Sequence, residues 1–179
     1  SNVAGYISSI DIGSSDNQIL ITVSNYGSTS VFETYSGGGS NGWVNVEGDL
    51  PDMPVRAGLY NRNNFNQVII GTDLGTWTSD DISSSSPIWL PSNDGLNNVR
   101  IDMLVNRDSD NAIAAATHGR GIFYSPNGFT STAPLNAAFT PDKTSGVFPL
   151  TISFNDRSTG PVSTWSWDFG DGTTSTDQS

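Results

Sequence analysis

The sequence predicts an all-β fold in which two to three antiparallel blades of a partial β-propeller precede a second, smaller β module. Short apolar runs alternate with turns rich in Gly, Asn, Asp and Ser along most of the chain. Similar segments recur at a fixed spacing: Thr72 and Thr117 lie 45 positions apart, and Asn66 and Asn111 have the same offset. A repeat of roughly 40–50 residues made of short strands has the length of a propeller blade.

The clearest hairpin is the copy at residues 111–124. Small and β-branched residues lead to Thr117, and aromatic residues follow a turn in which Gly119 and Gly121 can supply a positive φ. Two earlier segments repeat this pattern. The sequence therefore predicts three hairpin turns, at Asn25–Gly27, Asp73–Gly75 and His118–Gly121.

Each repeat is interpreted as up to four strands. The first repeat is predicted to contain strands at about 7–12, 20–24, 31–35 and 43–46. The second is predicted to contain strands at about 56–60, 68–72, 76–79 and 88–90. The third gives only three, at about 101–105, 113–117 and 121–124. Trp43 and Trp89 then fall on outer strands, where large aromatic side chains are expected to pack between blades.

Composition excludes several classes of partner and chemistry. The 179 residues include 18 acidic and seven basic side chains, which gives a net charge of −11. A chain this acidic should not attract nucleic acid or an anionic membrane through its overall field. No apolar run is long enough to insert into a bilayer, and the absence of cysteine excludes disulfides and thiol chemistry. Because it begins without Met and ends on a polar stretch, we expect the chain to be a piece of a longer protein.

Several motifs resemble those of sialidase-type and sortilin-type propellers. The segment from Ser36 to Trp43 is similar to the Asp-box of BNR repeats, with Ser36 and Trp43 as the matching residues, and Trp89 is the match in the second copy. The segments 50–56, 71–75 and 117–123 look like the closing blades of secreted propeller proteins. This resemblance implies that residues 1–125 are C-terminal blades of a larger propeller, whose other blades would be a partner of this segment.

A linker is predicted at 126–134, where apolar content falls. Beyond it, apolar residues alternate with polar ones from Phe148 to Phe154, and again from Trp165 to Phe169, as in half-buried strands. The stretch 165–172, which ends in a Gly-Asp-Gly turn, resembles the hallmark of the PKD domain. The resemblance implies that residues 135–179 are a truncated immunoglobulin-like β-sandwich.

Candidate ligand-binding residues lie in the predicted turns between the second and third strands, which share one face of a propeller with the connections between blades. These candidates are Asn25, Asp73, His118 and Arg120, whose polar groups suit a network with sugar hydroxyls. The connections are expected to bring Asp49, Asp52, Asp94 and Asn97 to the same face. Alternatively, Asn25 and Asp73 shape the turns, and Arg120 is a buried or inter-blade donor.

No catalytic residue, metal ligand or cofactor is predicted for this chain. His118 is the only histidine, and a metal site needs several ligands. Asp168 and Asp171 are the only hint of a calcium site, and they are expected to bond the backbone of their own turn instead. Glycoside hydrolysis needs two carboxylates facing each other across the scissile bond. Asp73 with Asp52 or Asp94 is a conceivable pair, but the sequence does not give their separation.

These observations together predict a fragment of a secreted or cell-surface protein with a non-catalytic binding or spacer role. The resemblances imply a polysaccharide or a cell-surface protein as the partner. The alternative is a fragment of a secreted glycoside hydrolase, in which the propeller is the catalytic domain and the PKD module an accessory. A purely structural cell-surface array is the third interpretation.

Overall fold

The structure is a computed structural model that describes residues 3–39, 42–93, 95–96, 98–126, 128–129, 137–158 and 164–178. The chain divides into two compact units, Ser1–Ser131 and Thr132–Ser179, which are described separately here. Every regular element in the described residues is a β-strand, which confirms the predicted all-β class.

The first unit contains three antiparallel sheets, and the first of them has four strands in chain order, β1-β2-β3-β4. Its strands are β1 (Ile7–Ile12), β2 (Ile19–Val23), β3 (Val31–Thr34) and β4 (Val44–Asn45). The first three lie within about a residue of the predicted ranges. The outermost strand is shorter than predicted, because only two of its residues pair with β3.

The second sheet repeats this order as β5-β6-β7-β8. Its strands are β5 (Val55–Asn61), β6 (Asn64–Thr72), β7 (Gly75–Ser79) and β8 (Leu90–Pro91). Strand β6 begins four residues before the predicted start, because the tight turn after Asn61 lets the chain pair with β5 again from Asn64 onwards.

The third sheet has three strands in the described part of the chain, in the order β11-β10-β9. They are β9 (Ile101–Arg107), β10 (Ala112–Thr117) and β11 (Gly121–Ser125). The sequence predicted three strands here, and the pairing agrees with that prediction.

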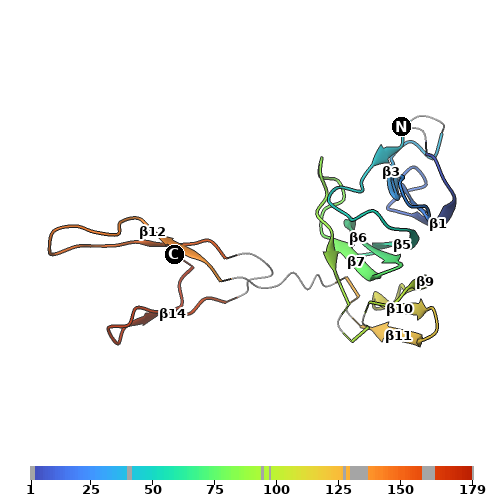
Figure 1. Ribbon diagram of the computed structural model, residues 1–179. Helices are drawn as coiled ribbons and strands as arrows, with labels where there is room; N and C mark the ends of the chain where they lie inside the picture. Colours follow the sequence, from blue (N-terminus) through green and yellow to red (C-terminus); the bar gives the residue numbers. More distant parts are fainter. Residues whose placement is uncertain are drawn as a thin grey trace. The chain divides into compact units, whose positions relative to one another are not determined.

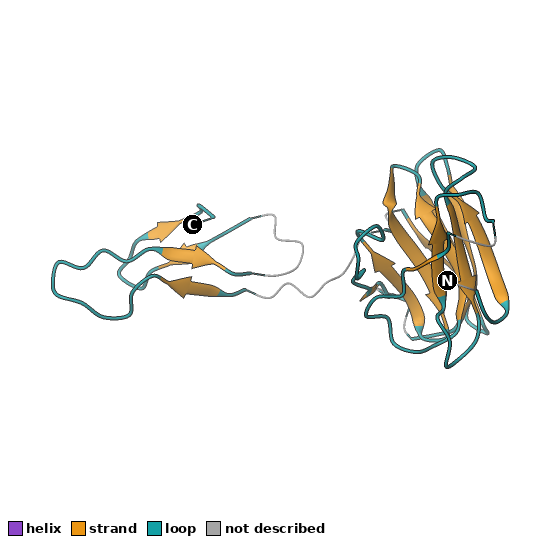
Figure 2. Cartoon of the chain, turned by 90° about the horizontal axis from the view of Figure 1, so that it is seen from above, coloured by secondary structure: helices purple, strands orange, loops and turns teal. Residues whose placement is uncertain are grey.

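The three sheets stack face to face, with the first strand of each sheet next to the first strand of its neighbour. Strand β5 contacts β1 on one side and β9 on the other, and the sheets appear as successive layers in Figures 1 and 2. This stack of two four-stranded sheets and one sheet with three described strands is the arrangement expected of propeller blades.

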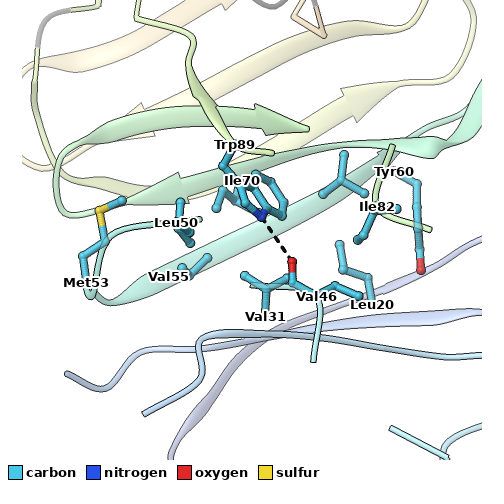
Figure 3. Packing of buried hydrophobic residues seen from close by; sticks show 11 residues of the cluster. Leu20, Val31, Val46, Leu50, Met53, Val55, Tyr60, Ile70, Ile82 and Trp89 are labelled. Carbon is cyan, nitrogen blue, oxygen red and sulfur yellow. Dashed lines mark hydrogen bonds between the residues drawn. The ribbon is translucent and has the colours of Figure 1, made fainter. Parts of the chain in front are cut away.

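The largest apolar cluster lies between the first and second sheets (Figure 3). Trp89 immediately precedes β8 and is only 2% exposed. Its indole N–H donates to the carbonyl of Val46 at 3.1 Å. Leu50 and Met53 lie at one end of the cluster and Tyr60 and Ile82 at the other. Trp89 therefore has the packing role predicted for it, and Trp43 packs, half-buried, on the cluster of Ile21, Val23 and Phe32.

Polar side chains also join the sheets to one another. The buried carboxylate of Glu33 in β3 accepts hydrogen bonds from Tyr60 Oη at 2.7 Å and from Gln18 Nε2 at 3.1 Å. Burial, and then the charge of Glu33, raises the pKa of the Tyr60 phenol. At the opposite end of the strands from the β2–β3 turn, Arg62 of the second sheet pairs with Asp11 of the first at 2.7 Å and with Asp108 of the third at 3.8 Å.

Phe129 extends the first unit into the predicted linker. It is 5% exposed and belongs to the cluster between the second and third sheets, with Leu96, Leu104 and Ile113. The carbonyl of Phe129 accepts from Gln67 Nε2 at 2.9 Å. The sequence around Phe129 is polar, which is why the burial of this side chain was not predicted. Residues 127 and 130–134 of the predicted linker lie outside the described residues.

The second unit consists of two small antiparallel pairs. They are formed by β12 (Phe139–Pro141) with β13 (Phe154–Asp156), and by β14 (Trp167–Asp168) with β15 (Thr174–Ser175). Aromatic rings gather between the pairs, with Phe139 5.7 Å from both Phe154 and Trp167, centroid to centroid.

The long strand predicted from Phe148 to Asn155 is wrong for most of its length. Only Phe154 and Asn155 of that stretch belong to a strand, and Phe148 is 93% exposed. An alternating pattern forms a stable strand when a neighbouring strand pairs with it and one of its faces is covered. Leu150 and Ile152 are only 38% and 37% exposed, but residues 148–152 belong to none of the strand pairs in the described part of the chain. The predicted strand at Trp165–Phe169 is reduced to Trp167–Asp168.

Candidate functional site

The candidate face is formed by the three loops that join the second and third strands of each sheet. In the second sheet this loop is only Asp73-Leu74, and in the third it is His118-Gly119-Arg120. Gly75 and Gly121, which open the following strands, have φ values of 93° and 80° and so supply the positive φ predicted for these hairpins. We call this set of loops, with the side chains that contact them, the turn face.

Asp73 is held by an ion pair within the second sheet. Its Oδ1 accepts from Arg56 Nε at 2.7 Å, and both side chains are half-buried. The hydrogen bond to Asp73 is the main reason that the pKa of Arg56 is raised. Asp102 of the third sheet and Tyr26 of the β2–β3 loop raise it further, so groups from all three sheets act on one guanidinium. The ligand-binding role expected of Asp73 stays a prediction.

His118 belongs to a second polar group, on the third sheet. Its Nδ1 lies 3.1 Å from Asp102 Oδ2, and Arg100 Nε donates to Asp102 Oδ1 at 2.6 Å. The backbone N–H of His118 donates to the carbonyl of Arg100 at 2.9 Å. Burial raises the pKa of the Asp102 carboxyl, but hydrogen bonds from Arg100 and His118 outweigh it, and the pKa is lowered. Asp102 is therefore an anchored carboxylate, and the imidazole of His118 remains mostly exposed.

Arg56, Arg100 and Asp102 were missed in the sequence. One signal could have found the two arginines, because each stands at the start of the first strand of its sheet: Arg56 is the second residue of β5, and Arg100 directly precedes β9. No comparable pattern in the sequence indicates that Asp102 turns toward His118. A small irregularity in β9 between Ile101 and Met103 accompanies that orientation.

Asn25 has a local structural role. Its Oδ1 accepts from the backbone N–H of Tyr6 at 2.6 Å and thereby ties the start of the chain to the β2–β3 loop. No described contact joins it to Asp73, His118 or Arg120. The structure agrees with the alternative that Asn25 shapes its turn, and leaves its exposed amide nitrogen available to a ligand.

Arg120 is exposed, so the expectation that it is a buried or inter-blade donor is wrong. Its backbone N–H donates to Thr117 Oγ1 at 3.2 Å, and no described residue forms an ion pair with its guanidinium. The neighbouring Gly119 and Gly121 have no atom within 4 Å of an added Cβ, which means that this turn projects into open space. No neighbouring residue is close enough to this turn to bury the side chain of Arg120.

Aspartates in the connection between the first and second sheets accept hydrogen bonds from backbone N–H groups. Asp52 accepts from the N–H of Gly27 at 2.8 Å, and Asp49 accepts from the N–H of Trp89 at 2.7 Å. A shallow cavity of about 300 Å³ lies beside this connection. Its lining residues are Gly27, Ser28, Thr29, Glu47, Leu50 and Asp52. Asp94 and Asn97, which were expected on the same face, lie outside the described residues.

Asp168 and Asp171 cap the turn in the second unit. Asp168 accepts from the N–H of Gly170 at 2.9 Å, and Asp171 accepts from the N–H of Thr173 at 2.8 Å. The side-chain hydrogen bond from Thr173 is the largest cause of the lowered pKa of Asp171. These bonds agree with the predicted turn role. In the described part of the chain, no cluster of three or more His, Asp or Glu residues could hold a metal ion.

A groove of about 540 Å³ opens beside this turn. Phe154, Trp167 and Phe169 provide its aromatic wall, and Asp171 and Asp177 lie at its rim. Since rings that would form the core of a sandwich line it, the groove is the open inner face of the two strand pairs.

No curated protein matches the sequence. One similar solved structure is the β-propeller domain of Cps50 (Swd1) from Myceliophteria thermophila, with 12% sequence identity and a TM-score of 0.48. That match covers 90% of this chain and 60% of the other, so the chain spans less than two thirds of that domain. Among the described residues, no helix is long and apolar enough to cross a membrane.

The family comparison concerns the second unit. Residues 131–179 match the model of the PKD domain, a stretch that starts four residues before the predicted module. The resemblance read from Trp165 to Gly172 is thereby confirmed, and the C-terminal part of this chain is a PKD region that follows three stacked antiparallel sheets.

Proposed function

We propose that this chain is a non-catalytic recognition segment of an extracellular or cell-surface protein, and that its turn face binds a polysaccharide. The observation that carries the proposal is that two polar groups stand on neighbouring strands, the Arg56–Asp73 ion pair at the start of β5 and the Arg100–Asp102–His118 group at the start of β9, which contacts β5. The sialidase-type or sortilin-type identity of the sheets is part of the same proposal. It rests on Ser36, Trp43 and the loop sequences, and it implies that further blades of the parent propeller flank this segment.

The chemistry of the turn face suits sugar hydroxyls. A hydroxyl both donates and accepts, and this face presents guanidinium donors beside carboxylate and imidazole groups. The ion pairs of Arg56 and Arg100 fix their side chains before a ligand arrives, which reduces the entropy lost on binding. Tyr26 and Leu74 are exposed in the same loops and provide apolar surface for the face of a pyranose ring.

The proposal is non-catalytic because the carboxylates of this face already have cationic or backbone partners. A general acid in a glycosidase needs a raised pKa so that it is protonated before the reaction. The pKa of Asp102 is lowered instead, and Asp73 is paired with Arg56. The alternative of a glycoside hydrolase would require its carboxylate pair elsewhere in the parent protein.

The extracellular location is inferred from the PKD region, because PKD domains are typical of extracellular and surface proteins. The strongly acidic composition is also unsuited to a nucleic-acid partner. A cell-surface protein remains the second kind of partner, and the binding experiment below distinguishes it from a glycan.

The test is binding of the full chain to a panel of soluble polysaccharides, measured by calorimetry. Arg120→Ala removes an exposed cation that has no described structural partner, so we expect several-fold weaker binding at an unchanged melting temperature. Arg157→Ala is the matched control, because Arg157 is an equally exposed arginine in the second unit. An equal effect of the two changes would rule out the turn face, and the absence of any glycan binding would rule out a glycan as its ligand. Release of reducing ends by the chain would contradict the non-catalytic assignment.

A further inference from the structure

The third sheet turns an apolar face away from the second sheet. Leu104, Ala115 and Phe123 lie opposite one another on β9, β10 and β11, and they pack in the cluster between the second and third sheets. Successive residues of a strand point to opposite faces, so the rows on either side of this one point outward. These rows are Val105 with Ala114 and Tyr124, and Met103 with Ala116 and Ile122. Their four larger side chains are between 52% and 77% exposed.

The corresponding face of the second sheet is an interface. The hairpins align the two sheets, because Thr72 lies opposite Gly75 as Thr117 lies opposite Gly121. The two outward rows of the third sheet therefore have counterparts in the second. These are Leu59 with Ile69 and Thr78, and Ala57 with Gly71 and Thr76. Three of these side chains, those of Ala57, Leu59 and Ile69, pack in the cluster with the third sheet. The third sheet thus repeats, on its exposed side, a face that the second sheet buries.

The first sheet has an exposed apolar surface at the other end of the stack. Ser9 Oγ of β1 accepts from the backbone N–H of Gly58 in the second sheet at 3.1 Å, so Ile10, the next residue, points away from that sheet. Ile12 points the same way. Ile10 is 66% exposed and Ile12 is 51% exposed.

Strand register also aligns the first sheet with the second. Phe32 lies opposite Asn45 of the fourth strand, as Trp77 lies opposite Pro91. From these two residues, the pairs can be followed across each sheet to its first strand. They are Phe32 with Ile21 and Ile10, and Trp77 with Ile70 and Gly58. Ile10 therefore occupies in the first sheet the position that Gly58 occupies in the second.

Each interface within the stack joins a small residue on one sheet to a bulky residue on the next. A Cβ added to Gly58 would lie 2.8 Å from the methyl carbon of Thr22 in the first sheet. A Cβ added to Gly71 would lie 2.7 Å from Ile101 and 3.5 Å from Leu104 in the third sheet. By register, Gly71 occupies the position of Thr22. Leu104 likewise occupies the position of Gly58. The two interfaces therefore use the same pair of positions with the sizes exchanged.

The two outer faces present this pair of positions a third time. Ile10 stands at the position of Gly58, on the outward side of the first sheet. Ala116 stands at the position of Gly71, on the outward side of the third. A bulky residue again matches a small one, as close packing between two sheets requires. Because β5 separates β1 from β9, these two faces lie at opposite ends of the stack and a single copy does not join them.

We propose that the occupant of both outer faces is a second copy of this chain, with the third sheet of each copy packed on the first sheet of the other. Each contact joins two different faces, and two such contacts close a ring with twofold symmetry. Three sheets from each copy give a ring of six, within the four to eight blades of closed propellers. In this ring the second copy supplies the flanking blades expected of the parent propeller.

Burial of apolar surface is the driving force of this contact. Ser9 and Asp11 of the first sheet bond to the backbone of the second sheet, and by register Met103 and Val105 occupy their positions in the third. The net charge of −11 on each copy opposes association, and salt screens this repulsion. Association should therefore tighten as the salt concentration rises.

The first test is the oligomeric state of the full chain, measured by analytical ultracentrifugation over a range of concentrations. We expect a reversible dimer whose affinity rises with salt. A monomer at every concentration would overturn the proposal, and so would a series of larger species, because the contacts would then not close a ring. Affinity that falls as salt rises would also overturn it, because ion pairs would then hold the copies together.

Three substitutions of the same kind test the two faces separately. Ile10→Arg alters the face of the first sheet and Ile122→Arg that of the third. Ile88→Arg is the matched control, because Ile88 is 63% exposed in the loop before β8, on neither outer face. We expect each of the first two changes to weaken dimerisation at least about tenfold, because the contact would bury an unpaired charge. Ile88→Arg should leave the affinity unchanged, and equal effects of all three changes would contradict the proposal.

A mixture of the two face variants tests which faces meet. Each variant keeps the face that the other has lost, so one contact in the mixed dimer joins two unaltered faces. We expect the mixture of Ile10→Arg and Ile122→Arg to associate more tightly than either variant alone. If the third sheet instead packed on its own counterpart, Ile10→Arg would leave the dimer intact and mixing would restore nothing, which would overturn the proposal.

The unmodified chain provides a readout that does not depend on how the variants fold. Its two methionines are Met103, on the outer face of the third sheet, and Met53, which is buried between the first and second sheets. Peroxide oxidises exposed methionine to the sulfoxide. We expect mass spectrometry to show that Met103 is oxidised more slowly at concentrations where the dimer forms, with Met53 protected throughout. Equal rates for Met103 in monomer and dimer would overturn the proposal. Protection of Met103 at every concentration would also overturn it, because another segment of the same chain would then cover the face.

Discussion

Asp73 forms an ion pair with Arg56 of the same sheet, at 2.7 Å. Asp73→Asn keeps the size of the side chain and removes the charge. We expect it to lower the free energy of unfolding by about 1 kcal/mol, because a half-buried ion pair contributes near the upper end of surface pairs. Urea unfolding measures this, with Asp16→Asn as the control at an exposed aspartate. Equal small losses in both variants would mean that the pair contributes nothing.

Asp156 in the second unit gives a pH dependence whose sign follows from its contacts. Hydrogen bonds from the side chain and backbone of Ser158, and from the indole of Trp165 at 2.9 Å, lower the pKa of its carboxyl from 3.8 to about 2. A folded-state pKa below the unfolded value stabilises the fold above about pH 4, and this stabilisation is lost as pH falls toward 2.

We therefore expect the stability of the second unit to fall between about pH 4 and 2, followed through Trp165 fluorescence in urea. In Asp156→Asn this part of the pH dependence should disappear. A carboxyl titration of Asp156 near its ordinary value, measured by NMR, would contradict the expectation.

At the candidate site, the positions of residues in turns could be predicted from the sequence. The positions of residues that depend on tertiary contacts could not. Asp73 and His118 stand in Gly-containing hairpins, so their place on the turn face followed from the repeat. Asp102 lies inside a strand, and only the folded third sheet brings it within 3.1 Å of His118. Arg120 was misjudged because its sequence context does not reveal whether a neighbouring sheet covers the turn.

At the level of strands and clusters, Trp89 joins the first two sheets. Trp89→Ala removes a buried indole and its hydrogen bond to Val46, so we expect a loss of about 3–5 kcal/mol in the free energy of unfolding. Trp43→Ala, at the equivalent but half-buried position, should cost clearly less. Chemical denaturation of both variants tests the difference, and similar losses would show that Trp89 is not the better packed of the two.

Phe129 offers the corresponding test for the second and third sheets. Phe129→Ala should destabilise the first unit by about 3–5 kcal/mol, the usual range for a buried aromatic ring. The exposed Phe148 is the matched control, because Phe148→Ala removes the same side chain from a solvated position and should change stability by less than about 0.5 kcal/mol. Thermal unfolding of both variants, followed by circular dichroism at a wavelength dominated by β-structure, measures the two losses. Similar losses would show that Phe129 does not stabilise the first unit through its burial.

Strands could be predicted where an alternation of apolar and polar residues was followed by a recognisable hairpin turn. In the first unit, Gly-containing hairpins fix the register, and the predicted ranges differ from the observed strands mainly at their ends. In the second unit, the alternation from Phe148 to Ile152 is as regular, but no described strand pairs with this stretch. The periodicity of a sequence indicates which side chains can lie on one face of a strand. Whether the strand forms depends on the neighbouring segments that pair with it and pack on that face.

For the molecule as a whole, the two units differ in how much they bury. The first has three clusters of buried apolar residues. None of the described residues of the second is fully buried, and its rings at Phe139, Phe154 and Trp167 are partly open to solvent. Because burial of apolar surface is the main stabilising contribution, the second unit should be much the less stable.

We expect two separate transitions in urea. The part of the fluorescence that is lost when Trp165 and Trp167 are replaced by Phe should change at lower urea than circular dichroism of the whole chain. Coincident transitions would show that the units stabilise each other. The division into two modules was itself readable from the sequence, but the boundary was not, since Phe129 belongs to the first unit and its neighbours in sequence gave no sign of it.

Pro91 limits which alternative pairings the second sheet can adopt. It stands opposite Trp77, at the one position of β8 where a ladder needs no donor. If the strand slipped by one residue, the proline would face Thr76 or Thr78, a backbone hydrogen bond would be lost, and the side chains of Trp89 and Leu90 would exchange faces. Pro91, a residue type usually unfavourable in strands, thus favours the observed register of β8 over a register shifted by one residue.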